Sequence, residues 1–333
     1  MKLSIVILCW NDSKIIPDCL RSVYAGTHST QLEIIISDNG STDGSVEFVR
    51  ENFPDVRVIE NGANLRFSKG NNVGIRACTG EYILILNPDT LIHEGSLDRW
   101  VAFADSHPEA GAFGCRVLNR DGSDQGCAQP LPTLGGLLMG ALYLRSLSRI
   151  SDFFPSDTYA KWKGHTVRTI GWQAGCGVMF RGDLLKQLGG FDERFFYYYE
   201  DVDLCHRVWK AGFPIIYTPD VTITHLGGQS TTARSPGSFE LDKYRNRYRY
   251  FYKYYGRRGV RRCRLITLLW LAARWAGYGL AQVVMPDLSR TQRLDLYRVA
   301  LKWNWRVDPV RYVERGDDPS LEPGERLRHQ PVQ

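Results

Sequence analysis

The sequence predicts an α/β fold built on a mostly parallel β-sheet, because short apolar runs alternate with stretches of helical character in its first half. Each run is apolar almost throughout, which is typical of parallel strands that helices cover on both faces. The first four predicted strands span residues 4–8, 33–37, 56–60 and 82–86. Further along, residues 170–181 predict one strand and residues 201–211 predict a helix.

Composition places the chain among ordinary globular proteins. With 333 residues, of which 43% are hydrophobic and 23% charged, it can form one large α/β domain and an appendage. Its eight cysteines lie singly, without zinc-ligand spacing or a disulfide pattern, so a reducing cytoplasm is the simplest setting. Trp10 interrupts the first apolar run early, which favours a buried strand over a signal peptide.

The C-terminal third has a different character. We expect the α/β domain to span residues 1–255, a basic and apolar helical extension residues 256–313, and a disordered tail residues 314–333. The stretch 244–264 holds nine Arg or Lys residues and no acid, and the apolar stretch 265–285 follows it. This pair predicts a helix lying on an anionic membrane surface, and we favour that interpretation over nucleic-acid binding.

Polar side chains follow the predicted strands at the points where the strands end. In open parallel sheets, ligands bind beyond the carboxyl ends of the strands. The polar groups there are Asn11-Asp12, the stretch 38–45, residues 61–64 and Asn87-Pro88-Asp89. We therefore expect one polar rim. Residues 119–164, rich in Gly, Pro and Ser, predict a long or mobile loop elsewhere.

Each polar group has two possible interpretations. The turn that begins at Asp38 can cap a helix or contact a ligand. Asn87-Pro88-Asp89 can be a rigid turn or can bind a hard cation that bridges diphosphate oxygens. His225 can be structural, or can contact a metal or phosphate. The acids at 200, 201 and 203, which follow aromatic residues 195–199, can stabilise a helix dipole or deprotonate a sugar hydroxyl.

Taken together, these motifs resemble the family 2 inverting glycosyltransferases of GT-A fold, and within them the rhamnosyltransferase type, over about residues 2–255. The resemblance implies a donor half at residues 1–118 and an acceptor half at 119–255. It also implies a nucleotide-sugar donor, a divalent cation (Mn²⁺ or Mg²⁺), and a saccharide or polyprenyl-diphosphate-linked acceptor. The enzyme would act in cell-surface polysaccharide synthesis, peripherally on the inner face of the cell membrane.

The resemblance further implies roles for individual residues. Cys9, Trp10, Asn11 and Asp38 would hold the base and ribose, and Asn64 and Asn72 would line the donor pocket. Asp89 would be the last acid of the DxD motif, with His225 completing the metal site. Asp201, the second acid of the ED motif, would be the general base, supported by Glu200. Trp172, Gly175 and Tyr199 would shape the acceptor side, although core packing accounts equally well for each of them.

Two departures from the family pattern concern the donor side. Arg66 and Lys69 stand where relatives commonly have glycines, and they either bind the diphosphate or narrow the choice of donor. Asn87 stands where many relatives have a first aspartate, which lowers the carboxylate count at the cation.

Two rival classes fit the sequence less well. A dinucleotide-binding oxidoreductase is disfavoured because no GxGxxG follows the first strand. A non-catalytic glycan- or nucleotide-binding protein of the same fold is disfavoured because Asp38, Asp89 and Asp201 are all present.

Overall fold

The computed structural model describes residues 1–149, 156, 158–159, 162, 164–195, 197–227, 236–284, 287–316 and 318. It divides into two compact units. The sheet unit comprises Met1–Leu131, Trp162–Phe196 and Glu200–Ala233, and the helical unit comprises Pro132–Lys161, Tyr197–Tyr199 and Arg234–Gln333. Of the predicted disordered tail, all but residues 314–316 and 318 lie outside the described residues.

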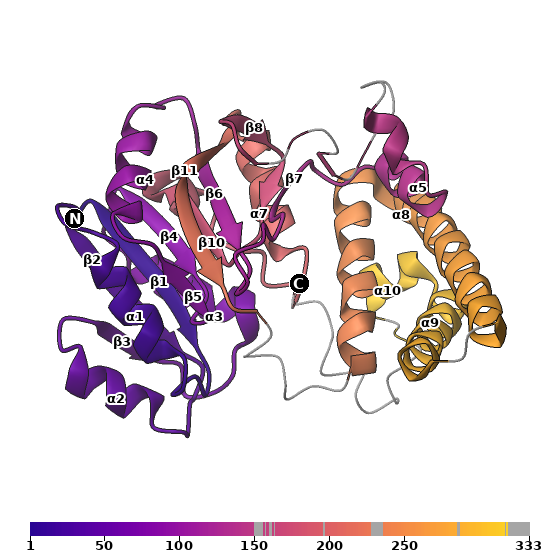
Figure 1. Ribbon diagram of the computed structural model, residues 1–333, viewed down its shortest axis with the longest axis horizontal. Coiled ribbons are helices and arrows are strands. Elements are labelled where there is room, and N and C mark those ends of the chain that lie inside the picture. Colours follow the sequence, from indigo (N-terminus) through magenta and orange to yellow (C-terminus); the bar gives the residue numbers. More distant parts are fainter. Residues whose placement is uncertain are drawn as a thin grey trace. The chain divides into compact units, whose positions relative to one another are not determined.

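The sheet unit contains the strands and the helices that cover them (Figure 1). Its strands are β1 Leu3–Cys9, β2 Leu32–Asp38, β3 Arg57–Glu60, β4 Tyr82–Leu86, β5 Thr90–Ile92, β6 Ala112–Leu118, β7 Ala128–Gln129, β8 Arg168–Ile170, β9 Trp172–Gln173, β10 Gly177–Arg181 and β11 Ile215–His225. Its helices are α1 Ile16–Ala25, α2 Ser45–Asn52, α3 Arg66–Ala77, α4 Ser96–Asp105, α6 Gly182–Gln187 and α7 Glu200–Lys210. The four strands predicted first are confirmed, as is the helix predicted at 201–211.

The main sheet has the strand order β3-β2-β1-β4-β10-β6-β11-β5, and β8 pairs with β11. Strands β3, β2, β1 and β4 pair in parallel, as predicted. Strand β10 is antiparallel to both of its neighbours, β4 and β6, and β11 is parallel to β6. Two successive reversals restore the direction, so β1, β2, β4, β6 and β11 all end at the same edge.

The central strand β1 is buried on both faces, and alternate residues pack against different helices. Leu3, Ile5 and Ile7 belong to a core cluster that also holds side chains of α1 and α4. Val6 and Leu8 point to the other face, because successive side chains alternate across a strand. There α3 packs so closely that a Cβ at Gly74 would lie 2.5 Å from a methyl of Val6. Helices on both faces explain why β1 is apolar throughout.

Two sequence-based predictions need correction. The single strand predicted at 170–181 is three strands, because its parts pair with different partners: β8 with β11, β9 with β7, and β10 with β4 and β6. The predicted loop at 119–164 contains β7, helix α5 (Leu134–Ala141) and the 3₁₀ helix η1 (Arg145–Arg149). Thr133 caps α5 by accepting a hydrogen bond from Gly136 N at 3.0 Å, a signal obscured by the glycine-rich composition.

The helical unit consists of α5, η1, α8 (Pro236–Val284), α9 (Leu288–Arg306) and α10 (Pro309–Arg315). Helix α8 is two helices joined at Gly256, whose φ of 65° is left-handed. Its second half contains the helix predicted at 265–285 and packs along α9. Buried contacts such as the stacked rings of Tyr248 and Trp303 hold the helices together. Among the helices in the described ranges, none combines the length and apolar character needed to cross a membrane.

Close packing of α3 on β1 gives a stability prediction. Gly74→Val is expected to destabilise the protein by about 1–3 kcal/mol, because the added side chain overlaps Val6 in a filled core. Gly277→Ala is the control, since a Cβ at the helical Gly277 would meet no atom within 4 Å and alanine favours helix. Chemical unfolding should show a lower midpoint for Gly74→Val alone; an unchanged midpoint would contradict the packing.

Candidate active site

The candidate site lies at the edge of the sheet where six strands end: β1, β2, β3, β4, β6 and β11. Pairing of β1 with β2 places Cys9 beside Asp38, and pairing of β1 with β4 brings Asn87 to the same edge. Strand β11 ends at His225, which pairs with Thr90 at the start of β5 and so lies next to Asp89. Strand β10 begins here, directly after Gly175 and Cys176. The fold therefore brings together residues predicted for the nucleotide, the cation and the acceptor.

On the donor side, the loops after β1 and β2 are tied to each other. The buried Asp38 carboxylate accepts hydrogen bonds from Gly40 N at 2.9 Å and Ser41 N at 3.0 Å. Asn11 N donates to Ser41 Oγ at 2.9 Å, and Asn11 Oδ1 accepts from Thr42 N at 2.8 Å. The bonds of Asn11 hold the two loops together as one wall of the candidate site. The Asp38 carboxylate, buried behind this wall, fixes the shape of the loop after β2.

Cys9 forms the floor between these loops. Its thiol is buried, and burial raises its pKa to about 12. At neutral pH, a thiol with this pKa remains protonated and is therefore a poor nucleophile. Cys9 is therefore a buried, unreactive thiol at the end of β1 rather than a catalytic group.

Asn64 and Arg66 lie at the start of α3. Asn64 Oδ1 accepts a hydrogen bond from Arg66 N at 2.9 Å and another from Asn39 Nδ2 at 3.3 Å. Arg66 has a φ of 68°, in the left-handed region that costs a non-glycine residue free energy. Strain of this kind gathers at functional sites. The backbone thus holds Arg66 in an unusual conformation at the helix terminus.

Asn72 uses both polar atoms of its side-chain amide within the sheet unit. Its Nδ2 donates to Phe191 O at 2.9 Å and to Glu193 Oε1 at 3.1 Å. Its Oδ1 accepts from Phe191 N at 2.8 Å. Both polar atoms are engaged, so the structure gives Asn72 the role of joining α3 to the loop before α7. These contacts do not support the predicted place in the donor pocket.

Asp89 and His225 form the predicted cation-binding pair. His225 Nε2 lies 3.2 Å from Asp89 Oδ1, and Asn87 Nδ2 lies 3.4 Å from the same nitrogen. A carboxylate and an imidazole suit Mn²⁺ and related ions. The described residues contain no group of three or more His, Cys, Asp or Glu side chains able to hold a metal. The pair fits a cation whose other ligands come from a bound molecule.

Asp201 occupies the first turn of α7 and faces the turn before β10. Its Oδ2 accepts from Gly175 N at 3.2 Å, and its Oδ1 accepts from Val202 N at 2.7 Å. Desolvation of the half-buried Asp201 carboxyl raises its pKa to about 6, against the opposing effect of these two N–H groups. A carboxyl with a pKa near neutrality suits proton transfer.

The neighbouring acids have different environments. Glu200 is buried at 8% exposure at the start of α7. Asp203 is fully buried and bonds to Arg207 Nε at 2.9 Å, and the same guanidinium donates to Leu188 O and Gly190 O. Asp203 therefore holds α7 to the turn at Gly190 and is separate from the site.

The three predicted acceptor residues have different local environments. Gly175 lies close to the ring of Phe67, which a Cβ would approach to 3.4 Å. Trp172 lies on β9, where it pairs with Gln129 of β7 and is half-buried. Tyr199 belongs to the helical unit, where Arg247 Nε donates to its hydroxyl at 3.2 Å. A Cβ at Gly175 would therefore make only ordinary van der Waals contact with Phe67.

Two residues that the sequence analysis missed lie behind His225. Gln125 Oε1 lies 2.9 Å from His225 Nδ1, and Gln125 Nε2 donates to Asn119 Oδ1 at 2.9 Å. Asn119 follows β6 directly, beside the end of the parallel strand β11. The apolar run before Asn119, followed by Asp121-Gly122, was the available signal for a strand and a tight turn.

The sheet, its single polar edge and the acids beside a histidine are features of a nucleotide-sugar-dependent transferase of GT-A fold. Two family models match the chain: Glycosyl transferase family 2 over residues 4–150, and Glycosyl transferase family group 2 over residues 145–300. An N-acetylglucosaminyl-diphospho-decaprenol L-rhamnosyltransferase of Mycobacterium tuberculosis (strain ATCC 25618 / H37Rv) is 33% identical over 227 residues, covering 62% of this chain and 70% of the relative. The chain therefore belongs to glycosyl transferase family 2 and is a glycosyltransferase.

Other similarities agree with this family. Rhamnosyltransferase WbbL of Escherichia coli (strain K12) is 26% identical over 170 residues, covering 48% of this chain and 60% of the relative. Mannosyltransferase PcManGT of Pyrobaculum calidifontis, solved with GDP-Man and Mn²⁺, superposes with a TM-score of 0.56. That likeness covers 95% of this chain and 88% of the other at 17% identity, and it confirms the fold.

The raised pKa of Asp201 gives a pH-dependent prediction. A folded-state pKa of about 6, above the ordinary value of 3.8, means that the folded protein binds this proton more tightly than the unfolded chain does. Stability from this group therefore increases as pH falls through about 6 and is lost as pH rises. Relative to Asp201→Asn, the wild type should gain about 2–3 kcal/mol of unfolding free energy between about pH 8 and about pH 4.

This comparison cancels the other titrating groups, since they are common to both proteins. Urea unfolding of wild type and Asp201→Asn at matched pH values measures the difference. A difference that does not change with pH would show that Asp201 titrates in its ordinary range.

Proposed function

We propose that this glycosyltransferase inverts configuration and moves rhamnose from a nucleoside diphosphate to a hydroxyl of a lipid-linked saccharide, with a divalent cation. The observation that carries the proposal is the meeting, at one sheet edge, of the Asp89–His225 pair and the half-buried Asp201. The Asp89–His225 pair suits a cation that binds a diphosphate, and Asp201 suits an acceptor hydroxyl that must lose a proton.

Asp201 acts as the general base in this mechanism. Its carboxylate takes the proton from the acceptor hydroxyl while that oxygen attacks the anomeric carbon of the donor. The new C–O bond forms as the bond from the anomeric carbon to the diphosphate oxygen breaks, and the nucleoside diphosphate leaves with the electron pair. A single displacement inverts the configuration. The N–H groups of Gly175 and Val202 keep the carboxylate oriented.

The donor would lie along the wall that Asn11 and Asp38 build, with the Cys9 thiol beneath it. Asp89 and His225 would hold the cation, with Asn87 beside them. When bound, the cation neutralises charge on the departing diphosphate. Arg66, in its left-handed conformation next to Asn64, supplies a second positive charge for the diphosphate.

The acceptor assignment relies on the names of the relatives. The M. tuberculosis relative is named for an N-acetylglucosaminyl-diphospho-decaprenol acceptor and for L-rhamnose. An O-antigen biosynthesis protein of Myxococcus xanthus is 29% identical over 227 residues. These names support a polyprenyl-diphosphate-linked saccharide and a role in cell-surface polysaccharide synthesis. Trp172, Gly175 and Tyr199 remain our assignments for the acceptor side.

A lipid-linked acceptor requires contact with a membrane, and helix α8 has a surface suited to it. Its exposed Leu265, Leu269, Leu280 and Val283 recur at helical spacing and so share one face. Leu280 is 70% exposed and Val283 is 81% exposed. The exposed Arg258 and Arg262 continue this face toward the start of the helix. An apolar stripe that continues into arginines suits an anionic lipid surface.

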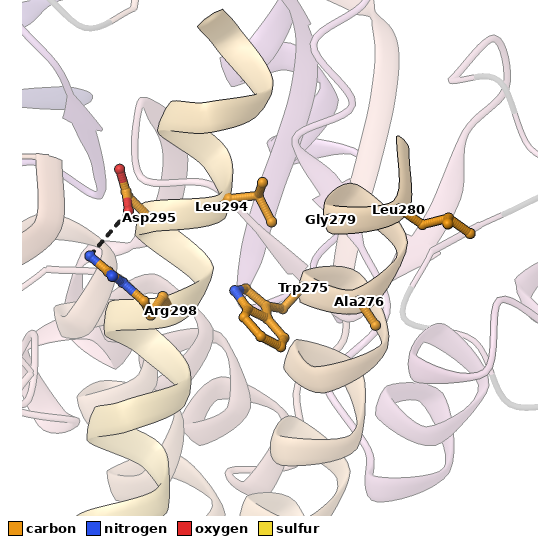
Figure 2. Close-up of a pocket in the computed structure, with 7 residues that line it drawn as sticks. All are labelled: Trp275, Ala276, Gly279, Leu280, Leu294, Asp295 and Arg298. Atoms are coloured by element: carbon orange, nitrogen blue, oxygen red, sulfur yellow. Dashed lines mark ion pairs between the residues drawn. The ribbon is translucent and has the colours of Figure 1, made fainter. Parts of the chain in front are cut away.

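A groove between α8 and α9 adds to this apolar surface. Its lining includes Trp275, Gly279 and Leu294, and its volume is about 390 Å³. Figure 2 shows Trp275 of α8 and Leu294 of α9 on facing sides of the groove, which Leu280 also lines. We assign this face to the inner leaflet of the cell membrane, with the protein bound peripherally.

Loss of the base tests the mechanism. Asp201→Asn is expected to lower the transfer rate by about 10²–10⁴-fold, because the acceptor hydroxyl then keeps its proton. Donor affinity should stay unchanged, since Asp201 contacts only the acceptor. The assay is transfer of rhamnose from dTDP-rhamnose to a polyprenyl-diphosphate-linked saccharide with Mn²⁺, with donor binding followed by thermal shift.

Asn87→Ala is the companion variant. It is expected to weaken the binding of the donor and the cation, because Asn87 lies beside the Asp89–His225 pair. Turnover retained in Asp201→Asn would move the base to another group, with Glu200 tested first. Donor binding without turnover in the wild type, for every acceptor tried, would favour a non-catalytic binding protein.

Vesicle binding tests the membrane face. The wild type should sediment with vesicles containing phosphatidylglycerol more strongly than with phosphatidylcholine vesicles, and salt should weaken the binding. The double variant Leu269→Glu with Leu280→Glu should weaken binding by at least about tenfold, since each buried leucine contributes about 1.5–3 kcal/mol. Val167→Glu is the control, because Val167 is 50% exposed in the sheet unit. Equal binding by the double variant would exclude this face.

A further inference from the structure

We infer that Arg247, with Lys243 one helical turn before it, binds the diphosphate of the lipid-linked acceptor. Both residues lie in the part of α8 before Gly256 and belong to the helical unit. The contact that carries this inference is the hydrogen bond from Arg247 Nε to Tyr199 Oη at 3.2 Å. Tyr199 belongs to the same unit, and it precedes the proposed base, Asp201, by two residues.

The three tyrosines before α7 lie along the first half of α8. Asn246 Nδ2 donates to Tyr197 O at 2.6 Å. Lys243 Nζ lies 5.1 Å from the ring centroid of Tyr198, and the third tyrosine accepts from Arg247. Because Lys243 and Arg247 are four residues apart on a helix, their side chains share one face. Two cations on one turn of α8 therefore contact two consecutive tyrosines.

Backbone strain marks the same segment. Tyr198 has a φ of 67° and Tyr199 a φ of 69°, both in the left-handed region that costs a non-glycine residue free energy. Such conformations persist only where surrounding contacts impose them, and they gather at binding and catalytic sites. The strained pair leads directly into α7, which begins at Glu200. The strain thus lies between the base and the residues that contact Arg247.

The guanidinium of Arg247 has no carboxylate partner among the residues that the structure describes. It is half-buried, and it contacts the Tyr199 hydroxyl and the ring of Tyr244, whose centroid lies 5.4 Å from Cζ. By contrast, Arg245, which is also half-buried, contacts two carboxylates at 2.9 and 2.7 Å. Removing a cation from water is costly unless an anion compensates it. The environment of Arg247 therefore suits an anion that comes from a ligand.

The remaining donors of Arg247 suit a phosphate group. A guanidinium has five N–H donors, and the bond to Tyr199 uses the one on Nε. Within the described ranges, neither Nη group has a hydrogen-bond partner. The fork of a guanidinium matches two oxygens of one phosphate, and the ammonium of Lys243 adds a point charge one turn away. A cation at each of two positions fits the two linked phosphates of a diphosphate.

Two diphosphates take part in the proposed reaction, and the position of Tyr199 favours that of the acceptor. The donor diphosphate is assigned to the cation of the Asp89–His225 pair. The acceptor hydroxyl meets Asp201, and two residues span at most about 7 Å of backbone, so Tyr199 lies close to the base. The acceptor diphosphate is bonded to the saccharide that carries this hydroxyl. Its identity as the acceptor's rests on the proposed function, whereas diphosphate binding by Arg247 does not.

Calorimetric titration of the full-length protein with farnesyl diphosphate, in EDTA, tests this site without a cation. Arg247→Met should weaken the binding by about 10–100-fold, because hydrogen bonds between charged groups are lost. Arg247→Lys keeps the charge without the fork and should give an intermediate affinity. Farnesol, which has no phosphate, should not distinguish wild type from Arg247→Met. Arg261→Met is the control, because Arg261 is an exposed arginine of the same helix.

Two further measurements separate this role from others. Chemical unfolding of Arg247→Met should show an unchanged or higher midpoint, since the variant removes a half-buried charge that no described carboxylate compensates. Binding of dTDP with Mn²⁺ should be the same in wild type and Arg247→Met. Weaker dTDP binding would assign Arg247 to the donor and overturn the inference. Unchanged farnesyl diphosphate binding in Arg247→Met, or an equal loss in Arg261→Met, would also overturn it.

Transfer assays connect the site to the reaction. With a saccharide on a lipid diphosphate as acceptor, Arg247→Met should raise KM by about 10–100-fold and change kcat little. With the octyl glycoside of the same saccharide, which has no diphosphate, the variant and the wild type should transfer equally well. Equal losses with both acceptors would overturn the inference. Farnesyl diphosphate binding that depends on Arg247, in a protein that transfers no sugar, would support the diphosphate site and refute the proposed function.

Discussion

The active-site edge depends on the placement of one antiparallel strand, β10, between β4 and β6. Because β10 opposes both neighbours, β6 and β11 run in the same direction as β1, β2 and β4. The carboxyl ends of these five strands then share one edge, and the turn before β10 comes to the same edge. A parallel β10 would have sent its preceding residue, Cys176, and with it Gly175, to the opposite side. The contact of Gly175 with Asp201 and the position of His225 beside Asp89 at this edge follow from this arrangement.

Different environments give similar carboxylates different tasks at that edge. Asp38 accepts two backbone N–H bonds and shapes a loop. Asp203 is paired with Arg207 and holds a helix in place. Asp201 accepts from two N–H groups that do not offset its desolvation, and its pKa rises to about 6. Separation of acid and base roles by environment is how a site built from carboxylates can perform proton transfer near neutral pH.

The helical unit is organised by a different balance. Its aromatic side chains lie mostly inside, as with Tyr248 against Trp303, whereas Leu265 and Leu280 remain exposed on α8. These exposed apolar side chains recur at helical spacing and form the face that we propose contacts lipid. In that proposal, the arginines that continue the same face meet the negative charge of the lipid surface. The exposed face of α8 is thus a property of the helical unit that the sheet unit does not share.

The sequence alone determined the features that are local. Apolar runs identified β1, β2, β3 and β4, and the polar residues after them identified most of the active-site edge of the sheet. Both signals can be read along the chain, because each strand is a short apolar run that ends at polar residues. Tertiary structure decided what depends on partners distant in sequence. Residues 170–181 divide into three strands because β8, β9 and β10 pair with different strands. The Asn72 side chain is engaged by hydrogen bonds to the backbone of Phe191, which is distant in sequence. Gln125 meets His225 across 100 residues, and only the parallel pairing of β6 with β11 brings them together.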